Sequence, residues 1–194
     1  MESTHSLAYK HLLIMIPLGI CASLGLNCFI SILKLTEIFP SYTEQVYEVL
    51  FSNSLSVGLS MYGFIIPGIE ELLFRWILFD KLAGYIPVKT AGIVSSVIFG
   101  IYHRNTVQFL YSFVFGLLLA YCFWLFNSIL ASWLLHGSAN IFIYLISSLD
   151  IFSFMGNVFW QAVGMVSGFA GTYFILRFLK RFKRNNGWEL FRIF

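Results

Sequence analysis

The sequence has 194 residues, of which 59% are hydrophobic and only 11% are charged. A soluble domain of this size could not bury so much apolar surface, so the composition excludes a soluble globular protein and indicates an integral membrane protein. The formal net charge is only +3, and it gives no reason to expect binding to nucleic acid.

Apolar runs predict about seven transmembrane or membrane-embedded helices, near residues 12–35, 46–66, 68–84, 88–103, 106–126, 128–148 and 156–180. Only helices satisfy their own backbone hydrogen bonds in lipid, so open strands are excluded. The first run is too long for the apolar core of a cleaved signal peptide, and we expect it to remain as a membrane helix. Short connections predict an all-α polytopic membrane helix bundle, with residues 1–194 as a single integral membrane domain. The last run predicts close helix packing through three glycines on or near one face, Gly164, Gly168 and Gly171.

The stretch PGIEELLFR, residues 67–75, places three charges inside an apolar run. Pro67 is typical of the first turn of a helix, so a helix is predicted to begin there, with both glutamates within about one turn of its N-terminus. Glu71 and Arg75 are four residues apart on one face and are predicted to form an ion pair. Glu70 points about 100° away and has no cation on its face, so its carboxylate needs a partner from another helix.

Two later runs carry histidines at helical spacing. SSVIFGIYH ends in His103, with Phe99 one turn before it, and SWLLHGSANIFIY places His136 one turn before Asn140 on the same face. Polar side chains at mid-membrane need partners inside the bundle. Taken singly, His103 is better explained as a residue at a helix end than as a catalyst. His136 and Asn140 are equally well explained as interhelical hydrogen-bonding residues.

Taken together, the three stretches resemble the motifs of the CPBP family, the CAAX proteases and bacteriocin-processing enzymes, also called the Abi family of intramembrane proteases. PGIEELLFR, SSVIFGIYH and NSILASWLLHGSANI match the three motifs, within residues 67–146. The family most often has glycine where this chain has Trp76, a position that touches none of the polar residues.

The resemblance implies a role for each polar residue. Glu70 would be the catalytic glutamate that activates water, and His103 would help to position that water. His136 and Asn140 would stabilise the oxyanion. Glu71 and Arg75 would hold the first motif in shape. Peptide hydrolysis needs a base beside the attacking water and donors where the carbonyl oxygen becomes negative, and these residue types supply both.

No cofactor is expected under this mechanism. The alternative is a zinc ion held by Glu70, His103 and His136, with an open position for water. The chain has no HExxH motif and asparagine is an uncommon zinc ligand, so the sequence favours the metal-independent mechanism.

The expected substrate is a peptide or a membrane protein. The abundance of Phe, Ile and Asn suggests a bacterial protein, which favours bacteriocin-like or membrane-associated peptides over prenylated proteins. Two other functions stay open, a non-catalytic membrane protein that binds a peptide or confers bacteriocin immunity, and a transporter in which the same residues relay protons. The chain has no visible repeat symmetry to favour the transporter.

The end of the last run is strongly basic, through Arg177, Lys180, Arg181, Lys183 and Arg184. Such clusters mark the cytoplasmic side and contact anionic lipid head groups, so we expect a bacterial cytoplasmic membrane protein with a cytoplasmic C-terminus and an interfacial tail over residues 177–194. Seven full spans would also place Lys34, Lys81 and Lys89 on the cytoplasmic side, and Lys10 and Arg104 outside. If segment 68–84 is re-entrant instead, the N-terminus moves inside, so the N-terminal side and the sidedness of the cavity stay open.

Overall fold

The computed structural model describes residues 12–40, 42, 54–149 and 156–186. The described residues are almost all helical and contain no strand, which confirms the all-α membrane class. Within the described segments, five helices are long and apolar enough to cross a membrane, namely Met15–Ile32, Leu55–Ala83, Thr106–Phe126, Ile129–Ser148 and Val158–Phe182. The apolar helix α8 (Val88–Tyr102) is shorter. Outside the span Leu55–Ala83, the remaining helices are α2 (Met15–Ile32), α3 (Leu35–Ile38), α9 (Thr106–Phe126), α10 (Ile129–Ser148) and α12 (Val158–Asn186).

The second long helix differs from the sequence-based prediction. It consists of α5 (Leu55–Ser60), η1 (Met61–Ile65), α6 (Ile66–Glu71), η2 (Leu72–Phe79) and α7 (Asp80–Ala83), which follow one another without a break. The prediction of two helices that meet near Pro67 is therefore wrong. Glu70 and Glu71 lie in the middle of a membrane helix, where the dipole of a helix terminus does not reach them.

The continuity of this helix through Pro67 has a local explanation. Proline has no N–H group, and its ring clashes with the carbonyl four residues earlier, which here belongs to Gly63. The turn directly before the proline, η1, is π-helical. This wider turn makes room for the ring, and its carbonyl groups receive hydrogen bonds from another helix, as described below.

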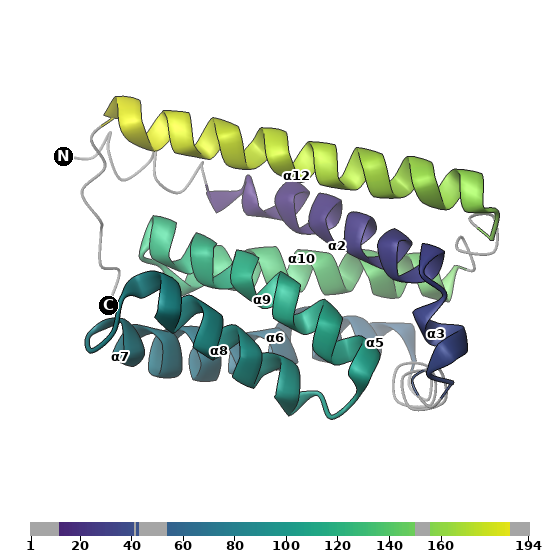
Figure 1. Ribbon diagram of the computed structural model, residues 1–194, viewed down its shortest axis with the longest axis horizontal. Coiled ribbons are helices and arrows are strands. Elements are labelled where there is room, and N and C mark those ends of the chain that lie inside the picture. Colours follow the sequence, from purple (N-terminus) through teal and green to yellow (C-terminus); the bar gives the residue numbers. More distant parts are fainter. Residues whose placement is uncertain (1–11, 41, 43–53, 150–155, 187–194) are drawn as a thin grey trace.

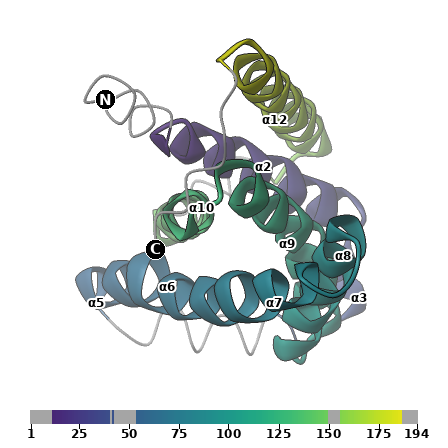
Figure 2. The ribbon, with the colours of Figure 1, turned by 90° about the vertical axis from the view of Figure 1, so that its left-hand side faces the viewer.

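α2 lies between α12 and α10, and α8 pairs with α9 (Figures 1 and 2). The packing of α12 on α2 is close because a Cβ atom on Gly168 would lie 2.5 Å from the backbone nitrogen of Gly25. The predicted approach at the glycine face is confirmed. Gly164 contacts Cys28 and Gly171 contacts Cys21, so the two helices run antiparallel.

The helices alternate in direction, and their ends gather at two ends of the bundle (Figure 1). One end contains the start of α2, the turn 84–87, the connection 127–128 and the end of α12, and we call it the basic end. Lys180 of α12 lies there, 5.7 Å from the centre of the Tyr121 ring near the end of α9. The opposite end contains the end of α2 with α3, the start of α5, the turn 103–105, the end of α10 and the start of α12.

This arrangement corrects the predicted placement of the surface lysines. Lys34 lies at the opposite end, whereas Lys81 and Lys89 lie at the basic end. The prediction that all three share one side is wrong because the segments 46–66 and 68–84 were each counted as a crossing. Their described parts form one helix, which removes a crossing and places the start of α2 beside the end of α12.

Candidate active site

Three charged or polar side chains form a buried network between two helices. Oε1 of Glu71 lies 3.3 Å from Nη1 of Arg75, which confirms the predicted ion pair. The same oxygen accepts a hydrogen bond from Nδ1 of His136 on α10, at 2.8 Å. The exposed fractions of Glu71, Arg75 and His136 are 0%, 1% and 5%. This network fixes the imidazole ring and directs its Nε2 atom away from Glu71.

Arg75 also connects the first motif to two further helices. Its Nη2 atom donates to the carbonyl of Gly116 on α9 at 3.4 Å, and its guanidinium carbon lies 4.3 Å from the centre of the Phe99 ring on α8. A buried cation is tolerated only where anions, acceptors or aromatic faces surround it, and this one has all three. Arg75 therefore holds η2, α8 and α9 together.

Glu70 faces a different environment from Glu71. Its Oε2 atom lies 3.7 Å from Nε2 of His136, so its partner comes from another helix, as the sequence required. This separation is longer than a direct hydrogen bond. Of the two glutamates, Glu70 lines a cavity and Glu71 does not.

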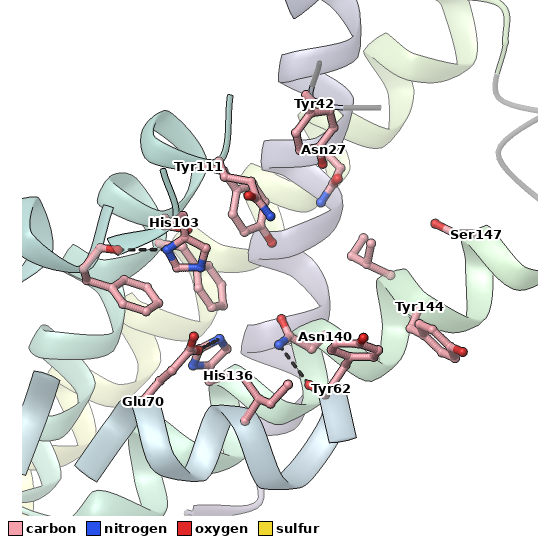
Figure 3. Close-up of a pocket in the computed structure, with 16 residues that line it drawn as sticks. Asn27, Tyr42, Tyr62, Glu70, His103, Tyr111, His136, Asn140, Tyr144 and Ser147 are labelled. Atoms are coloured by element: carbon pink, nitrogen blue, oxygen red, sulfur yellow. Dashed lines mark hydrogen bonds and ion pairs between the residues drawn. The ribbon is translucent and has the colours of Figure 1, made fainter. Parts of the chain in front are cut away.

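The cavity has a volume of about 400 Å³. All four residues predicted to act in catalysis line it, namely Glu70, His103, His136 and Asn140 (Figure 3). A water molecule occupies about 30 Å³ in the liquid, so there is room for water and for part of a peptide. The structure thus brings the three motifs to one cavity, while the supporting residues Glu71 and Arg75 lie behind its wall.

Phe99 contacts both histidines, through its backbone carbonyl and through its ring. Nδ1 of His103 donates to the carbonyl of Phe99, one turn earlier, at 2.8 Å. Since a carbonyl only accepts, this nitrogen carries the proton, and Nε2 is the other nitrogen of the ring. The Phe99 ring lies edge-on to both imidazoles, with centroids 4.9 Å from His103 and 5.8 Å from His136. Phe99 therefore acts as a spacer between them.

α10 also binds the π-helical turn that precedes Pro67. Nδ2 of Asn140 donates to the carbonyl of Tyr62, and Nε1 of Trp133 donates to the carbonyl of Phe64, each at 3.0 Å. These acceptors belong to η1, where the proline disturbs the regular helical hydrogen bonding. Asn140 thus has a backbone partner in addition to its place on the cavity wall.

The close approach at this turn also depends on a glycine. Gly137 lies against the carbonyl of Gly63, and a Cβ atom at position 137 would overlap that oxygen. Trp133, Gly137 and Asn140 follow one another at helical spacing, so one face of α10 contacts three successive carbonyls and donates to two of them. Sequence reasoning did not identify Trp133 or Gly137, because their partners are backbone atoms that no motif displays.

Sequence reasoning also missed much of the cavity wall. Besides the four predicted residues, the polar residues of this wall are Asn27, Tyr42, Tyr62, Gln108, Tyr111, Ser112, Tyr144 and Ser147. Some of them carried a usable signal, since Asn27 is the only side-chain amide in the apolar helix α2 and the polar residues of α9 lie at helical spacing. Figure 3 shows Asn27, Tyr42 and Tyr111 grouped on the side of the cavity away from Glu70.

The zinc alternative requires three ligands around one point. In the part of the chain that the structure describes, no three His, Cys, Asp or Glu side chains are arranged to hold a metal ion. His103 and His136 each direct Nδ1 to a protein acceptor, so each ring could offer a metal only its Nε2 atom, and Oε2 of Glu70 lies 3.7 Å from Nε2 of His136. Glu70, His103 and His136 therefore share a cavity without forming a three-ligand centre.

Comparison with known proteins gives a match to a protein family. A family model described as type II CAAX prenyl endopeptidase Rce1-like matches residues 52–142. No curated protein and no solved structure matches the chain. The matched residues include all three motifs and every residue of the buried network. The match confirms the resemblance that the motifs indicated: residues 52–142, which include the three motifs, are similar to the Rce1-like type II CAAX prenyl endopeptidase family.

Proposed function

We propose that this protein is an intramembrane endopeptidase in which Glu70 activates a water molecule. The observation that carries the proposal is the division between the two glutamates. Glu71 is fully buried and paired with Arg75 and His136, whereas Glu70 lines the cavity beside Nε2 of His136. A base that acts on water must face space that water can occupy, and Glu70 meets this condition.

The proposed reaction uses the residues of the cavity in sequence. The carboxylate of Glu70 takes a proton from water, and the resulting hydroxide attacks the peptide carbonyl carbon. Negative charge grows on the carbonyl oxygen, where Nε2–H of His136 and the second N–H of the Asn140 amide act as donors. Nδ1–H of His136 stays bonded to Glu71, so the ring acts in this step as an imidazolium with both nitrogens protonated. Glu70 then gives its proton to the departing amine as the C–N bond breaks. His103 accepts a hydrogen bond from the water and orients it.

The test replaces Glu70 by Gln, which keeps the shape of the side chain and removes the base. We expect the purified variant in liposomes to cleave no added membrane peptides. Mass spectrometry of the peptide mixture after incubation measures the cleavage. Glu37→Gln is the matched control because Glu37 is exposed on α3, and it should retain full activity. Undiminished cleavage by Glu70→Gln would refute the mechanism.

The substrate proposed is a peptide or a membrane-associated protein, processed in the cytoplasmic membrane of a bacterium. A prenylated protein is the alternative that the family description suggests, and a farnesylated version of each cleaved peptide distinguishes the two. The basic residues at the end of α12 are proposed to contact anionic lipid head groups, which would anchor this end of the bundle.

A non-catalytic role in peptide binding or bacteriocin immunity makes a different prediction for the same variant. If the protein acted by sequestering a peptide, cells carrying Glu70→Gln would be protected as well as cells with the wild type. Under the proposed catalytic function, protection is lost together with cleavage. The presence of the complete set of cavity residues favours catalysis.

A further inference from the structure

The cavity occupies only one half of the bundle. Glu70 and His136 lie near the middle of their helices, and the wall continues from them toward the opposite end through Asn140, Tyr144 and Ser147 along α10. The residues of the wall that lie on other elements are also toward this end. They include Asn27 in the second half of α2, His103 in the turn after α8, and Gln108 in the first turn of α9.

The half toward the basic end is filled by apolar side chains. Phe79, Ala91, Ala120 and Phe123 form one buried cluster there, with exposed fractions between 0% and 5%. On the other side of the bundle, the larger core cluster extends to the basic end through Leu12, Met15 and Leu179. A polar substrate therefore has a polar path to Glu70 from the opposite end and meets packed apolar side chains from the basic end.

The positive charges are distributed unevenly between the two ends. Among the described segments, the basic end has seven Lys and Arg residues, namely Lys81, Lys89, Arg177, Lys180, Arg181, Lys183 and Arg184. The opposite end has two, Lys34 and Arg104. Short segments rich in Lys and Arg remain in the cytoplasm during membrane insertion, so this difference assigns the basic end to the cytoplasmic side.

From these observations we infer that the cavity opens to the outer face of the cytoplasmic membrane, and that the peptides reaching Glu70 are exported or extracellular ones. The inference rests on the proposed function only for the identity of the cavity as a proteolytic site. The sidedness of the cavity follows from its position in the bundle and from the charges alone.

The orientation can be measured with single cysteines that change no Lys or Arg. Tyr85→Cys lies in the turn at the basic end, where Tyr85 is 89% exposed. Glu37→Cys lies at the opposite end, where the side chain of Glu37 is 68% exposed, and Ile38→Cys is a second reporter beside it. The wild type provides the background, because Cys21, Cys28 and Cys122 lie within membrane helices. The protein is produced in a bacterial host, and spheroplasts are treated with a membrane-impermeant maleimide.

We expect Glu37→Cys and Ile38→Cys to be labelled in intact spheroplasts, and Tyr85→Cys only after the membrane is permeabilised. The reverse pattern would overturn the inference, and so would equal labelling of both ends. The result does not depend on proteolysis, so it is separate from the test of the proposed function.

A second measurement links the orientation to the substrate. A fluorogenic peptide library is added to right-side-out and inside-out vesicles, with Glu70→Gln vesicles as the control. Cleavage by sealed right-side-out vesicles is the expected result, with inside-out vesicles active only after permeabilisation. Cleavage restricted to sealed inside-out vesicles would overturn the inference. If the labelling is as expected and no vesicle cuts any peptide even in detergent, the proposed function fails while the orientation of the cavity stands.

Discussion

Adjacent glutamates can have different roles when successive helical residues point in different directions. Glu71 points to Arg75 and His136 and is fully buried, whereas Glu70, one residue earlier, lines the cavity. Two opposite requirements are met in this way within one turn. A paired carboxylate stabilises the buried arginine, and a second carboxylate, only 6% exposed, lines the cavity.

This division predicts different consequences for the two glutamine variants. Glu71→Gln leaves Arg75 as a buried cation without its anion, which we expect to cost on the order of 3 kcal/mol of stability. It also weakens the contact that orients His136, so activity should fall as well. Glu70→Gln should abolish activity with little change in stability. Thermal unfolding in detergent distinguishes them, and equal shifts in melting temperature for both variants would contradict the assigned roles.

The metal-independent mechanism predicts that chelators leave proteolysis intact. Treatment with EDTA or 1,10-phenanthroline, followed by removal of the chelator, should change the rate of peptide cleavage by less than about twofold. The rationale is the arrangement of Glu70, His103 and His136, which does not converge on a three-ligand centre. Loss of cleavage that is restored by added Zn²⁺ would show that a metal is required.

Spacing in the sequence was sufficient to predict some of these contacts. The pairing of Glu71 with Arg75 is a local consequence of helical geometry, so it could be predicted from four residues of separation. The pairing of His136 with both glutamates joins residues that are about 65 positions apart. No periodicity displays such a contact, and only the family resemblance brought these motifs together before the structure did.

At the scale of helices, Pro67 gave the misleading signal. Proline favours the first turn of a helix, so a helix start was predicted, and the structure has a continuous helix instead. The energetic cost of the proline is reduced by the π-helical turn η1 and by donors on α10, neither of which is visible in a hydropathy pattern. Bulges of this kind occur frequently at functional sites, and this one lies one turn before Glu70.

The contact between Trp133 and this turn predicts a positioning role for the indole. Trp133→Phe removes the donor to the Phe64 carbonyl and keeps an aromatic ring, which should cost about 1 kcal/mol of stability. Because the contact sets the position of α10 against the first motif, we expect kcat to fall roughly tenfold, the effect of about 1.4 kcal/mol on the barrier, with KM little changed.

The control for this variant is Trp160→Phe, since Trp160 lies on α12 and does not line the cavity. It should leave both kinetic constants unchanged. An effect of Trp133→Phe on stability alone, with wild-type kcat, would mean that the indole supports the fold without positioning the site.

At the scale of the whole molecule, the sequence predicted the membrane class, most of the helices and four of the residues that line the cavity, but not which ends of the helices lie together. The direction of every helix depends on the number of crossings before it, so one wrongly divided segment moved Lys34 to the side of Lys81. In the structure, most of the described Lys and Arg residues lie at the basic end, a distribution that the erroneous crossing had concealed.

This separation predicts that α12 determines the orientation of the bundle. Replacing its five basic residues by Gln leaves two positive charges at each end among the described segments, Lys81 and Lys89 against Lys34 and Arg104. Since the difference in Lys and Arg sets orientation, we expect this variant to insert in both directions. The labelling of Tyr85→Cys by an impermeant maleimide should then rise from background to a substantial fraction in intact spheroplasts.

The matched control replaces Lys81 and Lys89 by Gln and keeps the basic residues of α12. Among the described segments, the basic end then keeps five positive charges and the opposite end has two. The orientation should therefore stay uniform, and Tyr85→Cys should stay protected from the maleimide. If the variant with the neutral α12 also inserts uniformly, orientation is set by the earlier helices. In that case the side of the cavity must be established from the labelling alone, because the charges at the end of α12 would not determine it.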